Sequence, residues 1–456
     1  MASIAYALEH IKCNLPSVLN RGTIERICRE HDYHWREREL DPATTVALFA
    51  QQVLHGNVPC SEVRHLAGGG QSLRTGSFSA QAYCAARQRL PLQVCNDLFS
   101  EVCQRLLPQT HQAQHCWHGH RVFHVDGSGF SMPDTPELQK AFGMPSGPKK
   151  GCGFPVAHLL VLFSAQTGLL LNAWASPLRT GDLAELPEAH LLLDPGDILI
   201  GDDAYGTYTH LALLLQANLH GLFPVHHKRI VDFTKGRPHT CEGKDAVAGM
   251  PRSRWIKSLG KEDQLVEYFK PQQKPLWMSQ KDYDALPDSI TVRELRRTVC
   301  RPGLGTVTVT MVTTLLDPKA YPARELLELR LRRWDVETNI GHLKTMMKMD
   351  VLHCKSEDGV RKELAMFCLV YNLVRAVMLE ASRRQQVPPS RISFADALKW
   401  MRHARPGEAM PTLIVVPYRP DRVEPRCKKR RPKEYDLMSK PRKVLRNRLK
   451  KQRKNV

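Results

Sequence analysis

Two short apolar segments of this chain each run directly into an aspartate, and this pattern constrains the possible folds most. Residues 121–125 (Arg-Val-Phe-His-Val) precede Asp126, and residues 197–201 (Asp-Ile-Leu-Ile-Gly) precede Asp202. Runs of this length, rich in β-branched residues, predict buried strands that end at the aspartates. In open α/β sheets, ligands bind at the edge formed by the carboxyl ends of strands. The pattern favours a sheet with two carboxylates at that edge, although for either aspartate alone a simple turn is the commoner explanation.

Further strand and helix patterns surround these two segments. Residues 157–163, 169–174 and 219–225 read as strands, and residues 210–217 read as a helix between two of them. Strands followed by helix–strand alternation favour an α/β fold with a mixed sheet. The first 115 residues instead show helical spacing, for which DNA binding and simple packing are equally good explanations.

The charge of the chain predicts a polyanionic partner. Its 456 residues are 42% hydrophobic and 25% charged, which is typical of a globular protein and excludes wholesale disorder. The formal net charge is +20, and residues 426–456 contain 15 Lys or Arg against only Glu434 and Asp436. We therefore expect a solvated basic tail that orders on nucleic acid, with a purely solubilising disordered tail as the alternative.

The remaining composition favours a cytoplasmic protein. We find no secretion signal and no window of about 20 apolar residues, so no membrane association is expected. The 13 cysteines include no Cys-x-x-Cys pair, which favours reduced thiols over a disulfide framework. Anchoring to a membrane surface by the basic tail is a weaker alternative, because it leaves the two aspartates unexplained.

A histidine-rich segment precedes the first predicted strand. It contains His111, His115, Cys116, His118 and His120. Structural zinc needs four ligands, usually in spaced pairs, and this segment lacks a second pair at such spacing. We therefore interpret it as a polar linker.

A third acidic residue lies on a predicted long helix at residues 322–349. Arg333, Glu337 and Lys344 are spaced by four and seven residues, which places them on one helical face. Glu337 could complete a metal site with the two aspartates, because carboxylate oxygens suit a hard cation such as Mg²⁺. Taken alone, a surface ion-pair ladder would explain this spacing better.

Together these motifs resemble bacterial DDE transposases of the insertion-sequence-4 family, over about residues 79–375. The first is Asp126-Gly-Ser-Gly-Phe-Ser-Met-Pro-Asp-Thr with a following Phe-Gly, and the second is Asp202-Asp-Ala-Tyr. The third is the family's Tyr-x2-Arg-x3-Glu-x6-Lys signature, which Arg333, Glu337 and Lys344 match, whereas Arg330 stands at its Tyr position.

The resemblance implies an α/β fold with an RNase H-like mixed sheet, flanking helices, a β-rich insertion and a helical N-terminal domain. The expected regions are a helical DNA-binding or dimerisation region (1–115), a catalytic core in two parts (116–228 and 306–385, the second with the Glu337 helix), the insertion (229–305), a C-terminal extension (386–425) and the basic, disordered tail (426–456). The 135 residues between Asp202 and Glu337 leave room for such an insertion.

The resemblance also implies a function. Asp126, Asp202 and Glu337 would hold Mg²⁺, for which Mn²⁺ is expected to substitute, and would catalyse DNA cleavage at transposon ends and joining to target DNA. The expected DNA contacts are Arg330, Arg333, Lys344, Trp255 and Trp277, the two tryptophans being either base-stacking residues or core residues. A homodimer on double-stranded DNA is expected. The alternatives are a transposase-derived DNA-binding protein and a nuclease without strand transfer.

Overall fold

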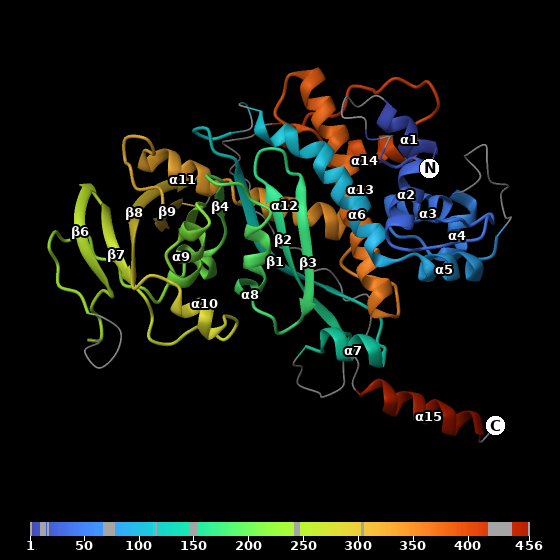
Figure 1. Cartoon of the computed structure of the whole chain (residues 1–456), viewed down its shortest axis with the longest axis horizontal. Coiled ribbons are helices and arrows are strands. Elements are labelled where there is room, and N and C mark those ends of the chain that lie inside the picture. The colour runs from blue at the N-terminus through green and yellow to red at the C-terminus, as the bar shows by residue number, and fades with distance from the viewer. Residues whose placement is uncertain are drawn as a thin grey trace.

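A nine-stranded mixed sheet runs through the molecule, with helices on both faces (Figure 1). The computed structural model describes residues 2–9, 15, 18–66, 78–112, 114, 116–145, 153–240, 247–301, 305–417 and 440–454. The strand order is β3-β2-β1-β4-β5-β9-β8-β7-β6. The strands are β1 (Val122–Ser131), β2 (Val156–Ser164), β3 (Leu170–Pro177), β4 (Ile198–Ile200), β5 (His220–Pro224), β6 (Ser253–Gly260), β7 (Asp263–Phe269), β8 (Ser289–Arg301) and β9 (Gly305–Thr313).

The first five strands form the core of this sheet. β1, β2 and β3 make an antiparallel meander, and β4 and β5 are added parallel to β1. The apolar runs predicted as strands supply its buried residues, which include Phe123, Leu160 and Leu199. The order 3-2-1-4-5 with this pattern of directions confirms the expected α/β class with an RNase H-like sheet.

Helices cover the two faces of the core sheet separately. One face packs against α8 (Asp182–His190) and α9 (Tyr208–Gln216), with α10 (Gln280–Asp284) beside them. The other packs against α11 (Ala323–Leu331), α12 (Trp334–Gly341) and α13 (Glu357–Gln385). α7 (Pro136–Phe142) follows β1, and α14 (Phe394–His403) packs on α13.

Six N-terminal helices lie at the opposite end of the molecule from β6 and β7 (Figure 1), and α1, α3 and α6 of this group pack on α13. They are α1 (Ala2–Glu9), α2 (Arg21–Glu30), α3 (Pro42–Leu54), α4 (Cys60–Leu66), α5 (Ala80–Arg89) and α6 (Leu92–Leu106). Contrary to the expectation from the sequence, α13 is long and apolar enough to cross a bilayer by length and composition. Its apolar window is, however, entirely buried within the fold, as in a central core helix.

The region expected as an insertion continues the core sheet. β9 pairs with β5, and β8, β7 and β6 follow it in antiparallel order. A buried ion pair, in which Arg293 donates to both carboxylate oxygens of Asp263 at 2.8 and 2.6 Å, joins β8 to β7. The strands that the structure describes within residues 229–305 therefore extend the core sheet.

Three expectations about local structure are wrong. β1 does not end at Asp126 but continues to Ser131, because residues 127–131 keep pairing with β2. The helix predicted at 322–349 is broken into α11, α12 and a π-helical turn, η6 (His342–Met346). The tail expected to be disordered contains α15 (Arg442–Lys454); its residues 426–439 lie outside the described part of the chain.

Candidate active site

The parallel pairing of β1 with β4 places Asp126 beside Asp202. Each paired residue of β4 lies 76 positions after its partner on β1, as in Val122 and Ile198. Asp126 and Asp202 are separated by the same 76 positions, so the register carries them to neighbouring places on one face of the sheet. Residues two apart on a strand share a face, and this face is the one that α11 and α12 cover.

Arg333 joins the third acid to this pair. Its guanidinium donates through Nη1 to Oδ2 of Asp126 at 3.1 Å and through Nη2 to Oε1 of Glu337 at 2.8 Å. The side chains of Arg333 and Asp126 are each 16% exposed, whereas that of Glu337 is 42% exposed. Asp126 of β1 and Glu337 of α12 therefore meet at one guanidinium, and the Glu337 side is open to solvent.

The predicted helix is broken next to Arg333. α11 ends at Leu331, a turn follows, and α12 begins at Trp334. Val336 is buried against the core, and its neighbour Glu337 extends from the more exposed side. Arg333, in the turn itself, reaches both the sheet and the following helix.

The site concentrates negative charge. Burial raises the pKa of the Asp126 carboxyl to about 6; Arg333 opposes this rise, and the charges of Asp202 and Glu337 add to it. Burial also raises the pKa of Asp202, with Asp203 and Asp182 contributing in the same direction. Asp126 and Glu337, which share one guanidinium, form with the nearby Asp202 a set of carboxylate oxygens that suits a divalent cation.

Lys344 also reaches β1, from the π-helical turn. Its Nζ donates to the carbonyl oxygen of Gly129 at 2.6 Å and to Oγ of Ser128 at 3.3 Å. The π-helical geometry of η6 gives the end of the α12 region a different pitch from an α-helix. Lys344 therefore lies over the same strand as Asp126.

Arg330 lies in the last turn of α11 and is half-buried near the same face. Burial lowers the pKa of His124 to about 3, and the charges of Arg332, Arg330 and Arg333 lower it further. The three arginines thus surround this buried histidine, two residues before Asp126.

Trp255 and Trp277 are not brought to the acids. Trp255 lies on β6, five strands from β4, which is roughly 24 Å at about 4.8 Å per strand. It is half-buried. Trp277 packs partly buried against the core on the α8–α9 side. Both belong to the extension of the sheet and not to the acidic cluster.

One group of hydrogen-bonded side chains beside β1 was not predicted from the sequence. Asp182, at the start of α8, accepts hydrogen bonds from the hydroxyl of Tyr205 and pairs with Nε2 of His158. A Cβ atom placed on Gly127 would lie 2.6 Å from the Asp182 carboxylate. Tyr205 belongs to the motif quoted above, but nothing local in the sequence pairs it with Asp182 or His158.

The described histidines of the polar linker serve separate contacts. His111 Nε2 lies 2.9 Å from an Arg121 guanidinium nitrogen, His118 pairs with Glu325, and His120 contacts Tyr321. These contacts connect the linker to β1 and to the region of α11.

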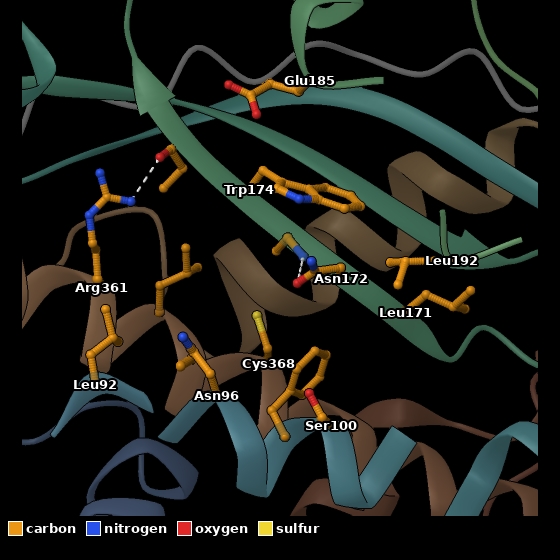
Figure 2. A pocket seen from close by; sticks show the side chains of 15 residues that line it. Leu92, Asn96, Ser100, Leu171, Asn172, Trp174, Glu185, Leu192, Arg361 and Cys368 are labelled. Atoms are coloured by element: carbon orange, nitrogen blue, oxygen red, sulfur yellow. Dashed lines mark hydrogen bonds between the residues drawn. The ribbon is translucent and has the colours of Figure 1, made fainter. Parts of the chain in front are cut away.

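None of the three acids lines the cavity shown in Figure 2. It has a volume of about 460 Å³ and is bordered by β3, α6 and α13. Arg361 donates to the carbonyl oxygen of Ala175 at 3.2 Å, and the side chain of Asn172 accepts from the Ala173 N–H at 2.9 Å. These bonds satisfy backbone groups of β3, the strand at one edge of the sheet, and therefore protect that edge.

Comparisons with known proteins give the family that this chain resembles. The family model described as "Transposase DDE domain" matches residues 117–373. The chain is 26% identical over 377 residues to the transposase InsG of insertion sequence element IS4 from Escherichia coli strain K12, covering 78% of this chain and 77% of that protein. It is 28% identical over 150 residues to the putative transposase InsZ of the same strain, covering 32% of this chain and 50% of that protein.

Two solved structures are also similar. The piggyBac transposase synaptic complex with hairpin DNA has a TM-score of 0.42 at 11% identity, covering 88% of this chain and 78% of that one. The pre-cleavage Mos1 transpososome has a TM-score of 0.16 at 11% identity, covering 41% and 60%.

Proposed function

Since this chain belongs to the transposase DDE domain family, we propose that it cuts DNA at transposon ends and joins the released ends to target DNA, with Asp126, Asp202 and Glu337 as the catalytic acids. The observation that supports this assignment most is the arrangement around Arg333. One guanidinium bonds both Asp126 and Glu337, residues more than 200 positions apart, beside the strand end that bears Asp202.

The three acids fit a divalent cation. A guanidinium already occupies the space between two of them, so positive charge is favourable there. The ligands are all carboxylate oxygens, which Mg²⁺ prefers, and Mn²⁺ suits the same set. When bound, such cations would activate the attacking hydroxyl and stabilise the leaving oxygen.

The proposed reaction has two steps, and in each step one bond to phosphorus forms while another breaks. In cleavage, the oxygen of water bonds to the phosphorus, the bond from phosphorus to the 3′-oxygen breaks, and that oxygen takes up a proton. In joining, the free 3′-hydroxyl oxygen bonds to a target phosphorus while the target's own bond to its 3′-oxygen breaks. One phosphodiester bond forms as another breaks, so no further reactant is needed.

Basic residues near the acids would hold the DNA. Arg330, Arg333 and Lys344 lie on the helical segments above β1, where they can neutralise phosphates beside the reacting bond. Lys344 has three ammonium donors and gives two to β1, which leaves one for a phosphate oxygen. Trp255 and Trp277 would contact DNA further out, along the extension of the sheet. Bringing two transposon ends together implies a homodimer in the DNA complex.

The direct test replaces each acid by its amide. We expect Asp126→Asn, Asp202→Asn and Glu337→Gln to reduce Mg²⁺-dependent cleavage of DNA carrying the element's ends to background, while affinity for that DNA is retained. Asp335→Asn is the matched control, because Asp335 lies on the same helix and pairs with Arg332 at 3.8 Å. Full cleavage by any one of the three variants would refute its assignment.

A further inference from the structure

A second group of metal-ligating side chains lies at the same edge of the sheet, outside the three acids. Ligand atoms of Asp203, His226 and His227 all lie within 4.8 Å of one another. Nδ1 of His227 is 3.5 Å from Oδ2 of Asp203, and the two imidazole rings are 4.2 Å apart between centroids. None of the three belongs to the catalytic acids proposed above.

The sheet topology explains why these residues meet. β4 and β5 are parallel, and each paired residue of β5 lies 22 positions after its partner on β4. Asp203 follows β4 and the two histidines follow β5, so both segments leave the sheet at the same edge. Carboxyl ends of parallel strands are where ligands bind in sheets of this kind.

The group lacks the cationic partner that an acidic side chain normally has. Within the described residues, the only ion-pair partner of Asp203 is His227, and no Lys or Arg lies within 4.0 Å of its carboxylate. The side chains of His227 and Asp203 are 70% and 42% exposed, so they can adjust by rotamer changes. The ligand atoms around a tetrahedral ion lie somewhat closer together than 4.8 Å, and rotamer changes of these exposed side chains can bring their ligand atoms to that separation.

We propose that Asp203, His226 and His227 bind one divalent transition-metal ion of the Zn²⁺ class. Two imidazoles and one carboxylate suit Zn²⁺ and its neighbours, whereas Mg²⁺ prefers a set made of oxygen alone. Three protein ligands leave at least one coordination position open, as in zinc sites that take a further oxygen ligand. The three residues lie next to Asp202, at the edge of the sheet where DNA is expected.

The test measures metal binding in a chain from which two of the three proposed catalytic acids, Asp126 and Glu337, are removed. Zn²⁺ binding to the Asp126→Asn/Glu337→Gln protein is measured by equilibrium dialysis, and then repeated after adding His226→Gln and His227→Gln. We expect the starting protein to bind one Zn²⁺ per chain. The two histidine substitutions should lower the affinity by more than roughly 10–100-fold, which is the loss when a residue that only supports a metal ligand is removed. An excess of Mg²⁺ should not displace the bound Zn²⁺.

Two controls make the result decisive. Any Zn²⁺ held by the cysteines is present in both proteins and cancels in the comparison, and His34→Gln, at an exposed histidine elsewhere, should leave binding unchanged. Thermal unfolding of the double-histidine variant verifies that it is folded. Equal Zn²⁺ binding with and without His226 and His227 would overturn the proposal. Because Asp126 and Glu337 are absent from both proteins and Asp202 is present in both, this result is independent of whether the chain cuts DNA.

Discussion

Gly127 is a residue of the candidate site at which a side chain would collide with a neighbouring carboxylate. It follows Asp126 on β1, and its N–H donates to the Asp126 side chain at 2.9 Å. A Cβ atom there would lie 2.6 and 2.7 Å from the two Asp182 carboxylate oxygens. That carboxylate cannot swing away freely, because Tyr205 and His158 both bond it.

We expect Gly127→Ala to destabilise the protein by about 1–3 kcal/mol, the usual cost of overpacking, and to lower cleavage because β1 carries Asp126. Urea unfolding and a cleavage assay measure the two effects. Gly181→Ala is the control, since nothing lies within 4 Å of a Cβ there. Adding Asp182→Ala to Gly127→Ala should recover part of the lost stability, because the two substitutions are coupled through this contact. If their effects on the free energy of unfolding are strictly additive, the contact is unimportant.

At the scale of single elements, the sequence predicted strands better than it predicted their ends. The apolar run before Asp126 is a strand, but Asp-Gly did not end it, because pairing with β2 continues through Gly129 to Ser131. A local turn preference was overridden by a neighbouring strand. The 76-residue separation of Asp126 and Asp202 acquired its meaning only from the register of β1 and β4.

The helix of the third acid shows the same limit. Spacing alone placed Arg333, Glu337 and Lys344 on one continuous helical face. The structure breaks the helix before Trp334 and changes its pitch at His342. Because both breaks are stabilised by contacts with β1, which is over 200 residues away, helical periodicity could not predict them.

A substitution at Lys344 tests whether this one side chain both holds the helical segment against β1 and contacts DNA. We expect Lys344→Met to destabilise the fold by about 1–2 kcal/mol, because it removes charged hydrogen bonds to β1. It should also reduce the slope of log affinity for DNA against log salt by about 0.9, the amount that one phosphate contact contributes. Lys319→Met, at an exposed loop lysine, is the control. An unchanged slope would leave Lys344 a structural role only.

At the scale of the whole molecule, positive charge is concentrated at one end of the chain. Eight of the thirteen residues of α15 are Lys or Arg. Its apolar residues Val444 and Leu449 are 41% and 58% exposed, and Figure 1 shows α15 apart from the main body. A basic helix without an apolar partner surface fits a phosphate backbone better than a packing role.

We therefore expect removal of residues 440–456 to weaken DNA binding mainly through its salt dependence. Each phosphate that the tail neutralises contributes about 0.9 to the slope of log affinity against log salt, so a tail that binds several phosphates should account for several times that amount. Binding measured across a salt series checks this, and the unfolding free energy should not change. An unaltered slope would mean that the tail stays in solvent when DNA binds.

Acid sensitivity is a second property of the whole fold, and it arises where α8 meets α9. His210 donates through Nδ1 to the carbonyl oxygen of Tyr205 at 2.7 Å, so its Nε2 must accept, from the Nε2 of His190 at 3.1 Å. Burial lowers the pKa of His210 to about 3, with the neighbouring His190 adding to the effect, and burial lowers that of His190 to about 4. Both rings are therefore neutral in the folded protein at pH values where exposed histidines are protonated.

Below pH 6.5 these two histidines bind protons in the unfolded chain but stay neutral in the folded protein. The free energy of unfolding is therefore at its full value above pH 6.5 and falls as the pH drops toward 4. At pH 5.5 each histidine should cost on the order of 1 kcal/mol. His190→Gln keeps an N–H donor for His210 but cannot titrate. Between pH 7.5 and 5.5, the free energy of unfolding of this variant should therefore fall by about 1 kcal/mol less than that of the unaltered protein. His34→Gln, at an exposed histidine, is the matched control. If urea unfolding shows the same acid loss with and without His190, the pair does not set the acid sensitivity of the fold.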